Sequence, residues 1–364
     1  MSRVYNFATG PGMMPAPVLE QARREFLDWN GQGLSLLEMP FTGDDFKAIQ
    51  RRAQDRLREL FGVPDNYRIL FMHGGASAQF SLVPLNLLGD NQRADYLETG
   101  HWSRRAISEG RRYCLVNVAG SSRGSDFSRV PLQHELQVYS RTAYCHYTSN
   151  ETANGVQFHY VPETGKVPLV ADMTSDFLSR PLDISRYGMI YASSQKNIGP
   201  AGFTVVIVRE DLLGRAHPAT PMVFDYRMQN DANSLLNTPV TFSIYLADLV
   251  FKWLAEQGGL VAMEQNSLRR SRLLYQAIES SEGFYRCPIE AAHRSRGSVC
   301  FNLADESLTP RFLEEAAGQR LVNLKGHAMV GGIRASLYNA MPDEGVTALT
   351  AFMHAFAMEH AAHV

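Results

Sequence analysis

The first sixty residues carry apolar side chains at helical spacing in two segments. One segment covers residues 17 to 29, stops before two glycines and places on one face Val18, Ala22, Phe26 and Trp29. The other begins at two acidic residues, which favour a helix N-terminus, and ends before Gly62; its apolar positions are Phe46, Ile49, Ala53, Leu57 and Leu60. Both patterns predict amphipathic helices.

From residue 68 the pattern changes to short apolar runs separated by helical stretches. These runs cover residues 68–72, 94–97, 143–147, 167–171, 189–192 and 203–208. Such alternation predicts an α/β fold in which helices cover both faces of a mostly parallel sheet. Ligands of such sheets bind beyond the carboxyl ends of the strands, so residues that directly follow each run are candidates for a site.

The last third of the chain has an α+β pattern. Helical spacing around Leu246 to Trp253 and up to about Ile278 is followed by two strand-like segments, 298–303 and 332–337, and by a final helix at 346–356. A chain of 364 residues exceeds what one core usually organises. We therefore expect a large domain at 16–260 and a small α+β domain formed by 1–15 and 261–364.

Charge and composition favour small-molecule chemistry. The 35 Lys and Arg nearly balance the 37 Asp and Glu and form no basic block, so we expect neither a nucleic-acid nor a membrane partner. The N-terminus lacks signal-peptide features, which favours a cytoplasmic protein. The 4 Cys and 11 His show no ligand spacing, so we expect buried thiols and no metal site.

One lysine stands between two apolar runs, in a turn of small residues. Lys196 follows the run at 189–192 and precedes the run at 203–208. A lysine amine held beside a buried cofactor loses solvation, and its lowered pKa suits Schiff-base formation and proton transfer. A solvated loop lysine is the alternative reading.

A carboxylate follows the preceding run. Asp172 could pair with a protonated pyridine nitrogen, which makes pyridoxal 5′-phosphate (PLP) an electron sink, or could cap a helix. The order of the two motifs along the chain, strand then Asp and strand then Lys, favours the cofactor reading of both residues.

Three further segments follow predicted strands. Gly74-Gly75 leads through Ala76 and Ser77 into a helix, where free N–H groups could hold a phosphate. Trp102 could stack on a flat ring or belong to the core. Thr152, in Asn150-Glu-Thr, could bond a ring oxygen or lie in an ordinary turn.

Arg334 lies among small residues in the C-terminal part of the chain. Its guanidinium fork matches a substrate α-carboxylate, although a surface strand arginine is the equal alternative.

Taken together, these segments resemble the phosphoserine aminotransferases, class-V PLP enzymes of fold type I, over essentially the whole chain. The segments that match the family pattern in order are Asn6–Pro15, Gly74–Gly75, Asn150–Thr152, Ser185–Ala192, Gln195–Gly202, Asn237–Pro239, Leu324–His327 and Gly331–Pro342. The resemblance implies a seven-stranded, mostly parallel sheet and a smaller α+β domain. It also implies amino-group transfer between glutamate and 3-phosphohydroxypyruvate, a reaction of serine biosynthesis.

The resemblance assigns a role to each site residue. Lys196 would carry PLP and move a proton between the substrate and the cofactor, with Asp172 at the pyridine nitrogen, Trp102 on the ring and Thr152 at the ring hydroxyl. The PLP phosphate would contact Ala76, Ser77 and Gln195, together with Asn237 and Thr238 of a second subunit, which implies a homodimer with composite sites. Arg334 would bind the α-carboxylate, with Thr9 nearby; the other expected substrate-binding positions are Phe41, Thr42 and His327.

The substrate-phosphate site departs from this pattern. Phe41 and Thr42 stand where the family usually has a His-Arg pair, and Ala328 replaces a basic residue after His327. Each lost charge-assisted hydrogen bond removes roughly 1.5 to 3 kcal/mol of binding. The alternative is therefore a paralogue acting on another, possibly non-phosphorylated, 2-oxo acid, unless a nearby cation such as Lys325 substitutes.

Two other classes compete with transamination. PLP lyase or desulfurase chemistry occurs in the same superfamily, although the chain lacks the reactive loop cysteine that a desulfurase needs. A PLP-binding regulator would need a DNA-binding module, for which no residues remain.

Overall fold

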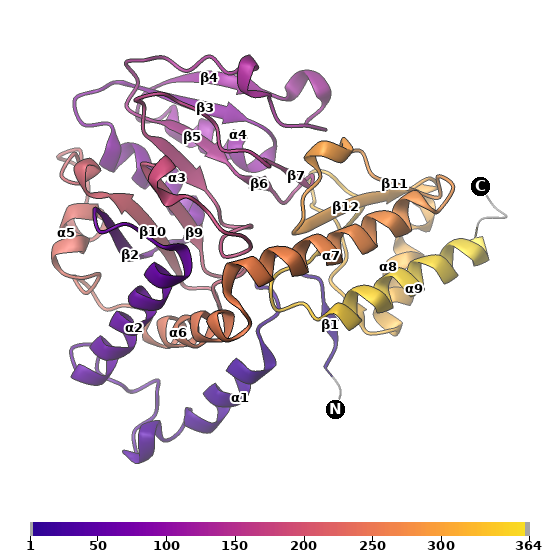
Figure 1. Cartoon of the computed structure of the whole chain (residues 1–364), viewed down its shortest axis with the longest axis horizontal. Helices are drawn as coiled ribbons and strands as arrows, with labels where there is room; N and C mark the ends of the chain where they lie inside the picture. Colours follow the sequence, from indigo (N-terminus) through magenta and orange to yellow (C-terminus); the bar gives the residue numbers. More distant parts are fainter. Residues whose placement is uncertain (1–2, 361–364) are drawn as a thin grey trace.

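The computed structural model describes residues 3–360 and centres on a seven-stranded sheet (Figure 1). Its strands lie in the order β2 (Tyr67–His73), β10 (Phe203–Arg209), β9 (Met189–Ser193), β8 (Leu169–Asp172), β5 (Cys145–Thr148), β3 (Arg93–Glu98) and β4 (Leu115–Ser121). All neighbouring pairs are parallel except those of β10, which runs antiparallel to both β2 and β9. The prediction of an α/β fold with a mostly parallel sheet is confirmed.

Both faces of this sheet are covered by helices, because its strands carry buried apolar side chains on both sides. One face packs on α1 (Ala16–Glu25), α2 (Asp44–Phe61) and α6 (Thr241–Glu256). The other face packs on α3 (Gly75–Leu87), α4 (His101–Gly110) and α5 (Tyr226–Asp231). Alternate residues of β2 show this division, since Ile69 and Phe71 belong to the first core and Leu70 and Met72 to the second.

Two sequence predictions for the large body need correction. The first predicted helix ends at Glu25 rather than near residue 29, because Asp28 and Ser35 bond backbone groups at 33 and 26 and take the chain out of the helix. Trp29 keeps its buried position from a 3₁₀ turn and packs edge-on against Tyr245. Strand β4 was missed, because it is an edge strand with mostly half-exposed side chains and carries no continuous apolar run.

The C-terminal part forms a second body beside the first. It contains the three-stranded sheet β11 (Tyr285–Arg286), β12 (Ser298–Leu303) and β14 (Ile333–Ser336), with α8 (Thr309–Gly318) and α9 (Asp343–His360). The N-terminal strand β1 (Tyr5–Asn6) pairs with β13 (Leu321–Val322), so Phe7 and Met13 belong to this core. The predicted strands at 298–303 and 332–337 and the final helix are present.

Helix α7 (Gly259–Glu279) contributes to both cores. Leu260 and Met263 pack in the core of the large sheet, whereas Leu274 and Ile278 pack in the C-terminal core (Figure 1). The division at residue 260 remains a prediction.

Within residues 3–360, no helix is long and apolar enough to cross a bilayer. Of the cysteines predicted to be buried, Cys145 and Cys300 are, whereas Cys114 and Cys287 are partly exposed.

Candidate active site

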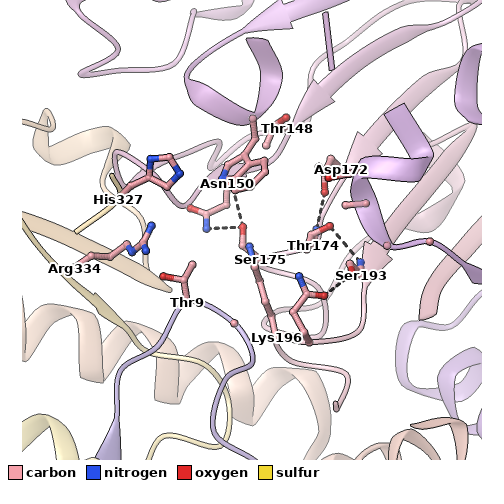
Figure 2. Close-up of a pocket in the computed structure, with 17 residues that line it drawn as sticks. Thr9, Thr148, Asn150, Asp172, Thr174, Ser175, Ser193, Lys196, His327 and Arg334 are labelled. Carbon is pink, nitrogen blue, oxygen red and sulfur yellow. Dashed lines mark hydrogen bonds between the residues drawn. The ribbon is translucent and has the colours of Figure 1, made fainter. Parts of the chain in front are cut away.

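A cavity of about 310 Å³ lies beyond the carboxyl ends of β5, β8 and β9, where the sequence placed its candidate residues. It brings together segments from the N-terminus, the large sheet and the C-terminal body. Among the predicted site residues, those that line it are Thr9, Ala76, Ser77, Trp102, Asp172, Gln195, Lys196, His327 and Arg334. Figure 2 shows Lys196 between Asp172 on one side and Arg334 with His327 on the other.

Lys196 lies in the connection between the antiparallel neighbours β9 and β10. Ser194 holds this connection through its N–H to Phe203 O (3.0 Å) and its hydroxyl to Pro200 O (2.6 Å). The lysine is 9% exposed, and burial lowers the pKa of its ammonium to about 8, although Asp172 acts in the opposite direction. At pH 7 about a tenth of this amine is therefore unprotonated and nucleophilic, far more than of an ordinary lysine.

Asp172 ends β8 and is 5% exposed. No helix begins there, so it is not a helix cap; its carboxylate instead accepts the Thr174 N–H (2.9 Å) in a local turn. Burial raises the pKa of Asp172, while the Thr174 hydrogen bonds and the Lys196 charge oppose that rise. These donors favour the ionised carboxylate that a cationic ligand nitrogen needs.

Behind Asp172 lies a buried pair, Tyr191 and His146. The Tyr191 hydroxyl is 2.9 Å from His146 Nε2, and a side-chain hydrogen bond with Asp172 helps burial raise the pKa of Tyr191. His146 Nδ1 has no partner, and an unpaired buried N–H costs more than an unpaired lone pair, so we assign the proton to Nε2. The Tyr191 hydroxyl then accepts from His146 and can donate a hydrogen bond toward Asp172.

Glu151 holds the N-terminus of α4 and with it Trp102. Its fully buried carboxylate accepts the backbone N–H groups of Trp102 (2.9 Å) and Ser103 (2.8 Å). The Trp102 indole donates to Thr152 Oγ1 (2.9 Å), and Arg334 donates to Thr152 O (3.1 Å). The Asn150-Glu-Thr segment therefore orients one side chain from each body of the molecule.

The turn before α3 presents backbone N–H groups to the cavity. Gly74 and Gly75 adopt positive φ (98° and 67°), so the chain turns sharply from β2 into the helix and leaves the first N–H groups free. Ala76 and Ser77 follow in the first helical turn, and Gln195 lines the same cavity. The lining residues here carry no charge, so an anion would be held by hydrogen bonds alone.

Arg334 reaches the cavity from β14, in the C-terminal body. Its Nε is buried without a partner, so part of the guanidinium fork is available to a ligand. Thr9 lies beside it, anchored by Tyr338, whose hydroxyl donates to Thr9 O (2.5 Å). Burial lowers the pKa of His327, and the nearby Arg334 charge acts in the same direction.

Several predicted site residues do not line this cavity within the single chain. Thr152 is instead hydrogen-bonded to two residues that do line it, Trp102 and Arg334. Phe41 packs against the large core, and Thr42, Asn237 and Thr238 lie elsewhere on the chain.

The structure adds lining residues that sequence reasoning did not name as ligands. Thr148, Asn150, Thr174 and Ser175 face the cavity, and Thr148 Oγ1 and Asn150 Oδ1 are buried without a hydrogen-bond partner. Thr148 directly follows the apolar run at 143–147 and Asn150 opens a quoted motif, so position after a strand was the available signal.

Fold and site together define a class-V aminotransferase. The aminotransferase class-V family model matches residues 4–349, so the chain belongs to that family, whose members use PLP. Within it, the chain belongs with the phosphoserine aminotransferases. It is 53% identical to the phosphoserine aminotransferase of Laribacter hongkongensis over 98% of this chain and 99% of that one. It is also 53% identical to that of Pseudomonas entomophila, over 99% of each.

Solved structures agree with this assignment. The phosphoserine aminotransferase from Bacillus circulans subsp. alkalophilus has a TM-score of 0.96 and 44% identity, covering 98% of this chain and 99% of that chain. A PLP-bound phosphoserine aminotransferase from Trichomonas vaginalis has a TM-score of 0.92 and 39% identity, covering 97% and 100%. The predicted family, enzyme class and cofactor are confirmed.

The cavity suits this cofactor on its own chemistry. It offers a buried amine for an aldehyde, a carboxylate for a pyridine nitrogen, an indole for a flat ring and uncharged N–H groups for a phosphate. The unpartnered oxygens of Thr148 and Asn150 are suitable acceptors for a ring hydroxyl.

Proposed function

We propose that this enzyme transfers an amino group reversibly between glutamate and 3-phosphohydroxypyruvate. The observation that carries the proposal is the position of Lys196, between a carboxylate for the cofactor and Arg334 for an α-carboxylate (Figure 2). An amino acid bound by Arg334 presents its α-carbon toward the lysine. The names of the relatives supply the acceptor.

Each residue has a physical task in this reaction. PLP, when bound, supplies the electron sink that stabilises negative charge on the substrate α-carbon. Asp172 keeps a proton on the pyridine nitrogen, and Tyr191 supports the ionised state of that carboxylate. Lys196 moves the proton to and from the α-carbon, a task suited to an amine with a pKa of about 8. Trp102 covers the ring and limits its contact with water.

A second acceptor class is favoured by the sequence departures. Phe41, Thr42 and Ala328 remove cations that the family uses for the substrate phosphate, and among the lining residues only Lys196, Arg334 and His327 are basic. A 2-oxo acid with an uncharged side chain would fit a cavity of this charge.

One kinetic experiment decides between these acceptors. The holoenzyme is converted to its pyridoxamine phosphate form with glutamate, freed of excess glutamate, and mixed with 3-phosphohydroxypyruvate, 2-oxoglutarate or pyruvate. A kcat/KM of about 10⁴ M⁻¹s⁻¹ or more with 3-phosphohydroxypyruvate supports the proposal. A value a hundredfold lower than that for pyruvate would support the second acceptor class.

We also propose a cytoplasmic homodimer with composite sites. Asn237, Thr238, Phe41 and Thr42 all lie away from the cavity of their own chain, which agrees with a role in the cavity of a second subunit. Mixing inactive Lys196→Ala with Asn237→Ala and refolding them together should restore part of the activity, because mixed dimers contain one intact site. Recovery no higher than the sum of the two variants alone would refute shared sites.

A further inference from the structure

The reaction cavity is short of positive charge for a substrate with two anionic ends. Lys196 is committed to the cofactor and Arg334 to the α-carboxylate under the proposed function. His327 is the remaining basic lining residue, and its lowered pKa leaves it largely neutral at pH 7. Glutamate and 3-phosphohydroxypyruvate each carry a second anionic group, for which this cavity holds no fixed cation.

A basic groove near the cavity is lined by residues of α4 and β4. We call it the arginine groove; it measures about 720 Å³, and its basic lining residues are His101, Arg104, Arg105, Arg111 and Arg123. Its lining contains one carboxylate, Glu98. The groove is therefore strongly positive, whereas the whole chain carries a formal charge of −2.

The charges in this groove are unequally neutralised. Glu98 bonds Arg123 (2.6 Å) and lies 3.8 Å from Arg104, so these two arginines share its charge. Arg105 and Arg111 form no ion pair with any carboxylate in residues 3–360. An unpaired guanidinium in a groove is available for an anion, and its planar fork matches carboxylate and phosphate oxygens.

A cluster of rings links the arginine groove to the reaction cavity. His327 lines the cavity and His101 lines the groove, and their ring centroids are 4.5 Å apart. Arg105 lies over the Trp102 ring at 5.5 Å, and Trp102 lines the cavity. Of the two groove arginines without an ion pair, Arg105 is therefore the one that contacts a residue of the reaction cavity.

We propose that Arg105, with the adjacent imidazoles of His101 and His327, binds the distal anionic group of the substrate. The ligand class is a 2-oxo acid or amino acid whose far end is a carboxylate or phosphate. This inference rests on the proposed function and supplies the cation that Phe41, Thr42 and Ala328 no longer provide. Approach of the anion would favour protonation of the two imidazoles, which adds further donors.

Two other candidate cations do not meet these conditions. Lys325 is exposed, lines neither the cavity nor the arginine groove, and has its backbone bridged to Ile333. Arg111 directly follows α4 and lies about 1.7 helical turns beyond Arg105, farther from the cavity.

The test measures single turnovers of the enzyme reconstituted with pyridoxamine 5′-phosphate, followed by the absorbance of the cofactor. Acceptors are 3-phosphohydroxypyruvate, 2-oxoglutarate and pyruvate, which differ in the distal group. Arg105→Gln removes the charge and keeps a polar side chain over Trp102. In this variant we expect the apparent Kd to rise about 10- to 100-fold for an acceptor with a distal anionic group. For pyruvate, which has none, we expect a rise of less than threefold.

Two variants control the interpretation. Arg112→Gln removes an arginine that lies two residues beyond the end of α4, pairs with Glu109 and lines neither space. It should leave the apparent Kd of all three acceptors unchanged. Arg105→Lys keeps the charge without the fork and should lose less than Arg105→Gln.

The possible outcomes distinguish a failure of this inference from a failure of the proposed transamination. A selective loss for 3-phosphohydroxypyruvate alone identifies a phosphate ligand, and a loss for 2-oxoglutarate alone identifies a carboxylate. An equal loss of affinity for all three acceptors would overturn the role of Arg105 while leaving transamination intact. Unchanged affinity for the two acceptors with a distal anionic group would do the same. An unmodified enzyme that reacts with no acceptor overturns the proposed function and this inference with it.

Discussion

Replacing the buried His146 should change how the stability of the protein depends on pH. The imidazole is 1% exposed, and burial lowers its pKa from 6.5 to about 3. Between these values the unfolded chain binds a proton that the folded protein does not, so stability falls as the pH falls through this window. Between pH 7 and pH 5 the loss amounts to about 2 kcal/mol, calculated from the unfolded pKa of 6.5.

His146→Gln keeps a donor near Tyr191 but cannot titrate. We expect the free energy of unfolding of the variant, measured in urea, to decline about 2 kcal/mol less than that of the unmodified holoenzyme over the same pH range. Tyr191→Phe is the matched control, because it removes the hydrogen bond and keeps the imidazole. It should lose about 1 kcal/mol at every pH and keep the slope. Parallel pH profiles for His146→Gln and the unmodified enzyme would refute the reasoning.

Three further changes test the site. After treatment with borohydride, Lys196→Ala should show no covalently attached PLP by mass spectrometry. Its kcat should be at least 10²-fold lower. Arg334→Lys should raise KM for the amino acid about 10- to 100-fold in steady-state kinetics, because a point charge replaces the bidentate fork. Glu151→Ala leaves the buried N–H groups of Trp102 and Ser103 unpaired, so its free energy of unfolding in urea should fall by about 2 to 6 kcal/mol, and that of Glu151→Gln by less. Unchanged kcat in Lys196→Ala, unchanged KM in Arg334→Lys or unchanged stability in Glu151→Ala would contradict the role assigned to that residue.

Much of this architecture could be predicted from the chain, because local patterns determine it. The six apolar runs all contain strands, and α2 begins at Asp44 and ends one residue before Gly62, which adopts the left-handed conformation. Edge strand β4 was not predicted, because many of its side chains are partly exposed to solvent and it lacks a continuous apolar run. The end of α1 depended on side-chain hydrogen bonds within the following loop, which periodicity does not report.

The cofactor site was predictable for a related reason. Parallel strands end at the same edge of the sheet, so residues that follow apolar runs, such as Asp172, converge there. The groups behind them were not predictable, since the contact of His146 with Tyr191 and that of Glu151 with α4 join segments about fifty residues apart in the sequence. The contact between the His101 and His327 rings likewise depends on how the two bodies pack.

The division of the site between two cores has a consequence for how the enzyme would fail. Lys196 is fixed by a hairpin within one core, whereas Arg334 is supplied by the other. Mild heat or denaturant that loosens the contact between the cores would therefore impair recognition of amino acids first. The protein would keep its yellow colour under conditions in which it no longer discriminates among substrates.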